Sequence, residues 1–270
     1  MKRIIIITGA SSGMGKEFAK QLTKTRNVEE IWLIARRIEK LQELEIELKK
    51  DNPFNINFKI ISQDISGKQG YDFFLNILEN EECKNSSDFV IDTLINNAGF
   101  GTYGPFEQTP ISRQLQMIDI NVISLTGICG ACIPYMKKGS RILNVASLAA
   151  YSPLGNFAVY AATKSYVHSF SMALAAELKD KGIHVLSLCP GSVSTEFAKI
   201  ASNGVRQEVK GGVPANKVVI HALKKLDKKK YVALMCFKWK IKAFLSRFVG
   251  RYFFARYTYL YDKRPFDYSE

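Results

Sequence analysis

The chain has 270 residues, of which 47% are hydrophobic, and a formal net charge of +13. A chain of this length and composition can bury one sizeable core, and it has neither the repeats nor the low-complexity linkers of a solenoid or a disordered protein. We expect no membrane-spanning helix, because no apolar run reaches about 18 residues. We also expect no signal peptide, because Ile4–Ile7 runs into a glycine motif without a small-residue cleavage site.

Hydrophobic strand patterns alternate with helical patterns as far as residue 189. Strands are expected near 4–7, 31–34, 57–62, 90–95, 141–146 and 183–189, and helices near 14–25, 38–50, 68–81, 111–136 and 157–180. Repeated strand–helix units predict an α/β fold with a doubly wound parallel sheet and helices on both of its faces. Ligands of such sheets bind beyond the carboxyl ends of the strands, so we expect the functional residues there.

A glycine-rich loop, T-G-A-S-S-G-M-G (8–15), follows the first predicted strand and precedes a helix. This position places backbone N–H groups and the positive end of a helix dipole against a pyrophosphate. Gly9, Gly13 and Gly15 stand where side chains would block a close approach. The loop therefore predicts a dinucleotide site, and a tight turn of small residues is the alternative.

The second predicted strand ends in Arg36 and Arg37, and no acidic residue appears until Glu39. An acidic residue at this place binds ribose hydroxyls, whereas arginine accommodates a 2′-phosphate through its planar guanidinium. We therefore expect NADP(H) to be preferred over NAD(H). The alternative is that both arginines are solvated residues that open the next helix.

Ser147, Tyr160 and Lys164 form the most informative set of polar residues. Tyr160 and Lys164 are four residues apart on a predicted helix, so their side chains share one face. A phenol ionises near pH 10 in water, and a neighbouring ammonium lowers its pKa toward the working range. With a serine hydroxyl from a strand end, the set predicts a proton-transfer centre for an alcohol/ketone pair. Taken singly, Ser147 could cap a strand and Tyr160 could be a helix-face aromatic.

In this order and spacing, the motifs resemble those of the short-chain dehydrogenase/reductase family over nearly the whole chain. The resemblance rests on the glycine loop, N-N-A-G (96–99), Asn121, Ser147, Y-A-A-T-K (160–164) and P-G (190–191). It implies a Rossmann-like fold with Tyr160 as the general acid/base. Lys164 would lower the pKa of Tyr160 and bind the nicotinamide ribose. Ser147 would orient the substrate oxygen, and Asn121 would hold a water that links Lys164 to solvent.

The resemblance also implies which residues contact the cofactor. Asp64 and Ile65 are expected at the adenine, Asn97 at a ribose, and Thr195 at the nicotinamide carboxamide. The full set is Gly9, Ser11, Ser12, Gly13, Met14, Gly15, Arg36, Arg37, Asp64, Ile65, Asn97, Ala98, Gly99, Tyr160, Lys164, Pro190, Gly191, Val193 and Thr195.

Two loops and a lid are expected to form the substrate site. The loops 100–106 and 149–157 carry aromatic and apolar side chains and no cation. Such walls suit a bulky apolar ketone or secondary alcohol, although half of these aromatics could be core packing. The expected substrate residues are Ser147, Ala149, Leu154 and Tyr160. A mobile lid is expected at about 194–215, which is rich in small and polar residues.

Residues 226–270 are expected to form a basic helical extension of the catalytic domain, 1–225. Lys224–Arg256 contains eleven basic residues and one acidic residue. On a helical wheel, an apolar arc lies between cations, as in a helix at an anionic lipid interface. The arc consists of Phe237, Ile241, Phe244, Leu245, Phe248 and Tyr252. A lid, a subunit contact and an acidic-polymer site are the alternatives, and we expect no nucleic-acid binding because no recognition motif accompanies the charge.

The sequence therefore predicts an NADP(H)-dependent oxidoreductase that transfers a hydride between nicotinamide and a bulky apolar carbonyl or alcohol, with a hydroxysteroid or a lipid-like compound favoured. A 3-oxoacyl or small-carbonyl reductase and a membrane-associated nucleotide-sensing scaffold are the alternatives. We expect a cytoplasmic homodimer or homotetramer, with a further contact to a membrane surface through residues 235–256. The histidines are isolated from one another and from acidic clusters, so we expect no metal site.

Overall fold

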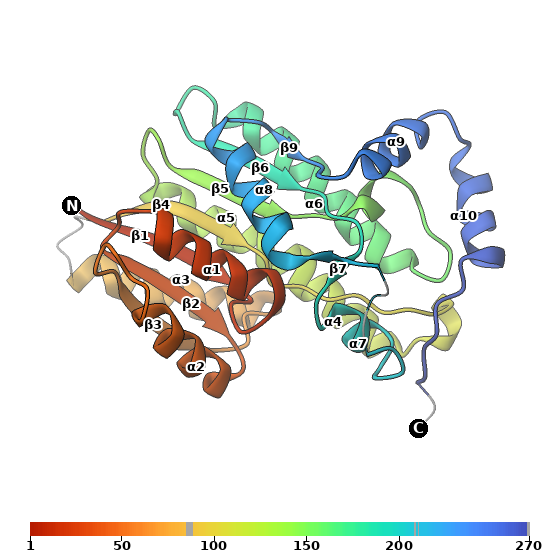
Figure 1. The fold of residues 1–270 in the computed structure, drawn as a ribbon, viewed down its shortest axis with the longest axis horizontal. Coiled ribbons are helices and arrows are strands. Elements are labelled where there is room, and N and C mark those ends of the chain that lie inside the picture. The colour runs from red at the N-terminus through yellow and green to blue at the C-terminus, as the bar shows by residue number, and fades with distance from the viewer. Residues whose placement is uncertain (85–88, 208, 210, 269–270) are drawn as a thin grey trace.

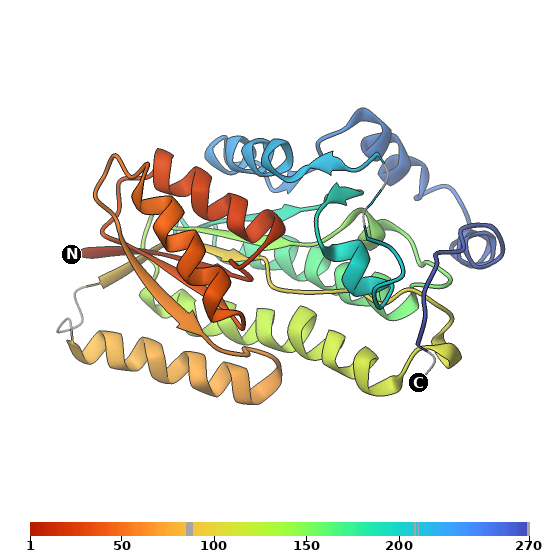
Figure 2. The same cartoon turned by 60° about the horizontal axis from the view of Figure 1, so that its bottom comes forward.

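The computed structural model describes residues 1–84, 89–207, 209 and 211–268. Within them, a seven-stranded parallel sheet with the order β3-β2-β1-β4-β5-β6-β9 forms the centre of the molecule (Figure 1). Helices α1, α2 and α8 cover one face, and α3, the α4–α5 run and α6 cover the other (Figure 2). The predicted doubly wound α/β fold is confirmed.

The elements have the following bounds. The strands of the main sheet are β1 Lys2–Thr8, β2 Glu30–Ala35, β3 Asn57–Ser62, β4 Phe89–Asn96, β5 Arg141–Val145, β6 His184–Leu188 and β9 Val232–Ala233, and a separate pair consists of β7 Val193–Ser194 and β8 Val213–Pro214. The helices are α1 Gly13–Thr25, α2 Ile38–Lys49, α3 Gly67–Lys84, α4 Ile111–Ile118, α5 Leu125–Cys132, α6 Ala158–Glu177, α7 Phe197–Ala201, α8 Ala215–Asp227, α9 Phe237–Leu245 and α10 Arg251–Tyr261.

The β-branched side chains of β1 pack into the core on both faces of the sheet. Ile4 and Ile6 pack with Trp32 and Phe74 on one face, whereas Ile5 and Ile7 pack with Phe18 and its neighbours on the other. Successive side chains of a strand point to opposite faces, so a continuous run of isoleucine is what a strand covered on both sides requires. All four isoleucines are fully buried.

The expected long helix at 111–136 is present but not uniform. It runs from α4 through a π-helical segment, Asp119–Ser124, into α5 and a 3-10 turn that ends at Tyr135. By length and composition the run Ile111–Tyr135 is apolar enough to span a membrane, although polar residues interrupt it and the sequence predicted no spanning helix. Half of its most apolar window is buried, and it packs on α3 and α6, so we interpret it as a core helix.

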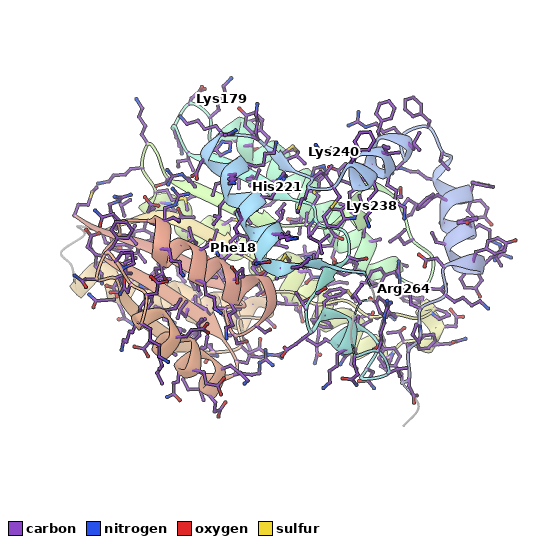
Figure 3. All side chains as sticks on the ribbon, in the orientation of Figure 1. Phe18, Lys179, His221, Lys238, Lys240 and Arg264 are labelled. Carbon is purple, nitrogen blue, oxygen red and sulfur yellow. The ribbon has the colours of Figure 1, made fainter. Side chains whose placement is uncertain are left out.

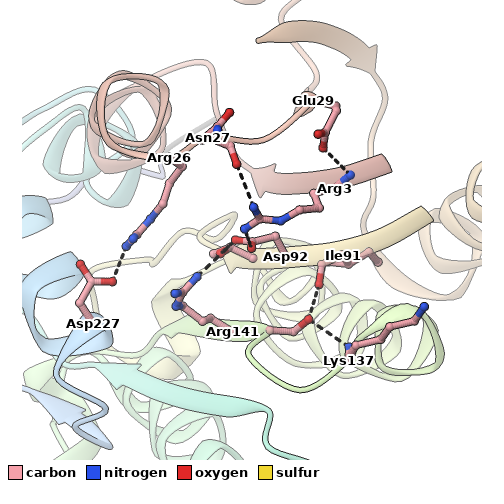
Figure 4. A network of polar contacts seen from close by, with 11 residues as sticks. Arg3, Arg26, Asn27, Glu29, Ile91, Asp92, Lys137, Arg141 and Asp227 are labelled. Carbon is pink, nitrogen blue, oxygen red and sulfur yellow. Dashed lines mark hydrogen bonds and ion pairs between the residues drawn. The ribbon is translucent and has the colours of Figure 1, made fainter. Parts of the chain in front are cut away.

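A buried carboxylate ties the amino-terminal parts of three strands together (Figure 4). Asp92 on β4 pairs with Arg3 on β1 and, at 3.3 Å, with Arg141 on β5. Hydrogen bonds from both cations and from Thr93 satisfy its oxygens, as a buried charge requires. This network lies away from the carboxyl edge of the sheet, which leaves that edge free for ligands.

The C-terminal region departs from the expected layout in two ways. The expected boundary after residue 225 falls inside α8, and β9 then pairs with β6, so the main sheet continues into the segment expected as an extension. The helical wheel over 237–252 was also wrong as a single helix. The helix ends at Leu245 and a new one starts at Arg251, because a turn and Gly250 separate them.

Candidate active site

The polar residues predicted from sequence gather at the carboxyl edge of the sheet. Asn97 follows β4, Ser147 follows β5 and Pro190 follows β6, while Tyr160 and Lys164 lie in the first turns of α6. Parallel strands end at the same edge, so residues up to about 90 positions apart in the chain meet there. The structure therefore brings the predicted proton-transfer set and the glycine loop to one side of the molecule (Figure 1).

Tyr160 and Lys164 are both almost completely buried. The Lys164 Nζ lies 5.8 Å from the centre of the Tyr160 ring and donates to the Val145 carbonyl at 2.8 Å. The Ser147 hydroxyl accepts from the Ala149 N–H at 3.1 Å and lies close enough to the Tyr160 hydroxyl to lower the pKa of that phenol. The structure therefore brings the three residues together.

The pKa of Tyr160 differs from the expectation. Burial raises the pKa of this phenol to about 12, and the neighbouring Ser147 hydroxyl opposes that rise only in part. The expected lowering by Lys164 is not seen, because the ammonium faces Val145 and desolvation dominates. Burial also lowers the pKa of Lys164 to about 8. At neutral pH the pair therefore consists of a neutral phenol and an ammonium.

Asn121 lies in the π-helical segment and is buried. Its amide donates to the Phe100 carbonyl at 2.9 Å and to Thr163 at 3.1 Å, and its Oδ1 accepts from the Phe100 N–H at 3.2 Å. A Cβ on Gly99 would lie 2.5 Å from the Asn121 Oδ1 and 3.5 Å from the Lys164 Nζ. Asn121 and Lys164 therefore flank the same glycine, which fits a π-bulge at a functional site.

The loop between β1 and α1 has the shape that a pyrophosphate needs. Gly9 and Gly13 have positive φ angles, and a Cβ on Gly15 would lie 2.0 Å from the Gly9 carbonyl oxygen. The Ser12 side chain makes no cap to the first turn of α1, so the N–H groups there are available to bind an anion. Ser11 and Met14 complete the loop, and these residues fit a dinucleotide.

Arg36, Arg37 and Asp64 are the charged residues that the sequence predicts at the adenosine end of the cofactor. Arg36 is exposed, and its guanidinium lies 3.6 Å from the Asp64 carboxylate, whose pKa is lowered mainly by hydrogen bonds from Ser66 against an opposing burial effect. A cleft of about 310 Å³ opens beside Arg36 and Asp64. Arg37 instead bonds the Ser11 hydroxyl at 3.2 Å and Glu196 at 3.0 Å. Arg36 is therefore the arginine with the freer guanidinium.

The remaining predicted cofactor residues line the same edge. Asn97 donates to the Thr8 carbonyl at 3.0 Å, and the Thr8 hydroxyl accepts from the N–H groups of Asn97 and Ala98. The Pro190 carbonyl accepts from the Leu148 N–H at 2.8 Å. Ile65 and Val193 are buried beside these loops, and a Cβ on Gly191 would lie 2.4 Å from the Trp239 ring.

The expected lid begins next to the glycine loop. A Cβ on Gly13 would lie 3.1 Å from the Thr195 side chain, and Glu196 holds Arg37. Strand β7 pairs with β8, so the two ends of the segment 194–215 are tied together, and α7 lies between them. The start of the segment, at Thr195 and Glu196, therefore lies against the glycine loop and Arg37.

An aromatic cluster surrounds Tyr160. Phe157 stacks on the Tyr160 ring at a centroid distance of 4.2 Å, Phe197 lies 5.4 Å from it on another side, and Tyr103 lies 5.1 Å from Phe157. The predicted substrate residues Ala149 and Leu154 pack against this cluster. Sequence patterns suggested Tyr103 and Phe157 but not Phe197, which reaches the cluster from α7.

The C-terminal strap, residues 262–268, was not predicted at this site. The Arg264 guanidinium lies 4.7 Å from the centre of the Phe157 ring and 5.4 Å from that of Tyr103. Phe266 packs against the cluster and Gly104. The Asn203 amide donates to the Asp267 carbonyl at 2.9 Å, and the Tyr268 hydroxyl donates to the Ala201 carbonyl at 2.9 Å. A cation thus lies against aromatic walls that were expected to have none.

The model of the short chain dehydrogenase family matches residues 3–205. The chain belongs to this family. Its relatives include a NADP-dependent 3-hydroxy acid dehydrogenase of Schizosaccharomyces pombe, 33% identical over 76% of this chain and 77% of the relative. A very-long-chain 3-oxoacyl-CoA reductase of Rattus norvegicus is 34% identical over 72% of this chain, which spans 61% of that relative.

Among solved structures, a short-chain dehydrogenase of Sphingobium yanoikuyae in complex with NADPH has a TM-score of 0.76. It is 24% identical, and the match covers 88% of this chain and 91% of that one, so it shows a shared fold. The protein is therefore a short-chain dehydrogenase that acts on CH–OH or carbonyl groups of a small molecule with a nicotinamide cofactor.

The buried ammonium of Lys164 predicts a pH-dependent effect on stability. A fall in its pKa from 10.5 to about 8 corresponds to about 3 kcal/mol against folding, offset in part by the hydrogen bond to Val145. Lys164→Met is therefore expected to raise the free energy of unfolding by about 2 kcal/mol at pH 7, as measured by urea denaturation.

The stability difference between the wild type and Lys164→Met depends on pH because the folded and unfolded states bind the Lys164 proton differently. Below about pH 8 the lysine is charged in both states, so the penalty is complete. Between pH 8 and 10.5 only the unfolded state keeps the proton, so the wild type gains stability and the advantage of the variant shrinks. The exposed Lys50→Met is the control, with no such trend. If the free energy of unfolding of Lys164→Met differs from that of the wild type by the same amount at pH 7 and at about pH 9.5, the assignment is contradicted.

Proposed function

We propose that the protein is an NADP(H)-dependent reductase/dehydrogenase of bulky apolar ketones and secondary alcohols, with Tyr160 as the general acid/base. The observation that carries this proposal is the placement of buried Tyr160 in an aromatic cluster, with the Lys164 Nζ 5.8 Å from the centre of its ring and the Ser147 hydroxyl near its own. A phenol in this position can exchange a proton with a substrate group that enters the cluster.

The residues of the chain support a specific proton path. The bound nicotinamide supplies the hydride. Tyr160, neutral at pH 7 because burial raises its pKa to about 12, is then ready to donate its proton to an oxygen that gains negative charge. The Ser147 hydroxyl can hold that oxygen. The position of the Lys164 ammonium with Asn121 around Gly99 supports a route by which the proton lost from Tyr160 is replaced.

The preference for the phosphorylated cofactor rests on Arg36 and Arg37. Two guanidinium groups follow β2, and the nearest carboxylates, Asp64 and Glu196, are each engaged by one of them. Arg36 is more exposed than Arg37, so its planar guanidinium is the better placed to bind a 2′-phosphate. A relative that is 33% identical carries NADP dependence in its name, which supports the same preference.

The substrate class rests on the aromatic cluster and on relatives. Tyr103, Phe157 and Phe197 offer large apolar contact area around Tyr160. The named activity of the rat relative on a very-long-chain 3-oxoacyl compound supports a lipid-like substrate, and a mouse relative 32% identical is a 17-beta-hydroxysteroid dehydrogenase. We also propose that α7, in the segment 194–215, and the C-terminal strap close over the substrate.

A test of the proton-transfer role is the substitution Tyr160→Phe. Removal of the hydroxyl is expected to lower kcat for NADPH-dependent ketone reduction by about 10²-fold or more, because the neighbouring groups cannot supply the proton. The dissociation constant of NADPH is expected to change little. A variant that keeps more than about a tenth of the wild-type rate would show that another group is the acid.

A test of cofactor preference is Arg36→Ala. Loss of the guanidinium is expected to weaken NADPH binding by about ten- to a hundredfold and NADH binding hardly at all, because a charged hydrogen bond to phosphate is worth about 1.5–3 kcal/mol. Isothermal titration with both cofactors measures the two affinities. Arg113→Ala, whose guanidinium bonds the Ile200 carbonyl instead, is the matched control. Equal losses for the two cofactors would remove the argument from the 2′-phosphate.

A test of the C-terminal strap is Arg264→Ala. The guanidinium covers Phe157 and Tyr103, so its loss is expected to open the aromatic cluster to water and raise KM for a bulky ketone by about fivefold. The NADPH dissociation constant serves as the internal control and is expected to stay constant. An unchanged KM across steroid, acyl and small aliphatic ketones would exclude the strap from the substrate site.

A further inference from the structure

The two C-terminal helices leave a large apolar surface uncovered. Eleven large apolar side chains between Phe237 and Tyr261 are exposed, and Phe237, Phe248 and Tyr252 are each more than 70% accessible. We call the exposed side chains of α9, α10 and the turn between them the aromatic–basic surface. Its apolar members are Phe237, Ile241, Phe244, Leu245, Phe248, Tyr252, Phe253, Tyr257, Tyr259, Leu260 and Tyr261. Exposed patches of this kind mark a binding surface.

The same surface is strongly cationic. Six basic residues alternate with the aromatics from Lys238 to Arg256, and all six are exposed. Residues 228–261 contain no acidic residue. Figure 3 shows Lys238 and Lys240 on α9. A partner for this surface must therefore offer an apolar environment to the aromatic side chains and carry negative charge.

The surface is held in place by contacts with the active-site loops. Buried Trp239 on α9 packs where a Cβ of Gly191 would lie, and the Thr258 hydroxyl on α10 accepts from the Gly155 N–H at 2.8 Å. The Asn156 amide donates to the Tyr259 carbonyl at 3.0 Å. The outward side chains thus lie beyond the same edge of the sheet as the aromatic cluster around Tyr160.

We propose that the aromatic–basic surface docks on an anionic lipid membrane. Aromatic side chains prefer the boundary between lipid headgroups and acyl chains, and neighbouring lysines and arginines bind anionic headgroups. A symmetric contact with a second copy would bring this surface against itself and place the six cations opposite one another. An acidic polypeptide uses the cations but leaves the exposed rings without an apolar environment, and no nucleic-acid recognition motif accompanies the charge. An anionic bilayer satisfies both groups.

The full-length protein tests this by co-sedimentation with vesicles, without substrate or cofactor, so that the outcome does not depend on the proposed reaction. Vesicles of phosphatidylcholine alone are compared with vesicles that also contain about 30 mol% phosphatidylserine. The ring variant is Phe237→Ser/Phe248→Ser/Phe253→Ser, and the charge variant is Lys238→Glu/Lys240→Glu/Arg247→Glu. Controls with matched chemistry are Ile46→Ser/Phe54→Ser and Lys50→Glu/Lys179→Glu/Lys181→Glu, all at exposed positions away from this surface (Figure 3 for Lys179).

We expect the wild type and both controls to bind the anionic vesicles, and the ring and charge variants to bind at least about tenfold more weakly. Thermal unfolding verifies that each variant is folded. Equal binding to both vesicle types, or equal loss in the lysine control, would overturn the proposal. A ring variant that binds as well as the wild type would overturn it in favour of a polyanion site. A wild-type dimer that the ring variant separates, without vesicle binding, would overturn it in favour of a contact between copies.

Discussion

The arrangement of the active site depends on the burial of one ammonium group. Lys164 is removed from water beside Tyr160, and its ammonium donates a hydrogen bond to the Val145 carbonyl. Burial lowers the pKa of Lys164 to about 8 and raises that of Tyr160 to about 12, so both groups keep their protons near neutral pH. An apolar side chain at position 164 would make the fold more stable. We therefore interpret the buried charge as a requirement of proton transfer, since perturbed ionisable groups cluster at functional sites.

The surrounding elements hold this pair in place. The carboxyl ends of β4, β5 and β6 bring Asn97, Ser147 and Pro190 to one edge, and the π-helical segment turns Asn121 toward Gly99. On the other side of the pair, the glycine loop has no room for a side chain at Gly15, because a Cβ there would overlap the Gly9 carbonyl. The parallel sheet therefore fixes the distance between the part that fits a dinucleotide and the part that fits a ketone.

The sequence predicted most of this edge and little of what covers it. The β-branched run Ile4–Ile7 and the spacing of Tyr160 and Lys164 are local signals, so the sheet and the proton-transfer set could be predicted from them. Arg264 and Phe266 reach the aromatic cluster only because the chain folds back after α10, and no local periodicity encodes that return. The break at Gly250 was missed for a related reason, since the apolar residues continue across the turn. The pKa of Tyr160 went the other way from the prediction because spacing reports proximity and not the depth of burial.

The most direct test of the account is the titration of Lys164 itself. Nitrogen-15 NMR of the lysine side chains, with the Lys164 signal assigned by its loss in Lys164→Met, measures the protonation midpoint without turnover. The account predicts a midpoint near pH 8, well below the ordinary value of 10.5. A midpoint near 10.5 would mean that the ammonium is solvated, and it would contradict the buried proton-transfer pair on which the proposed function depends.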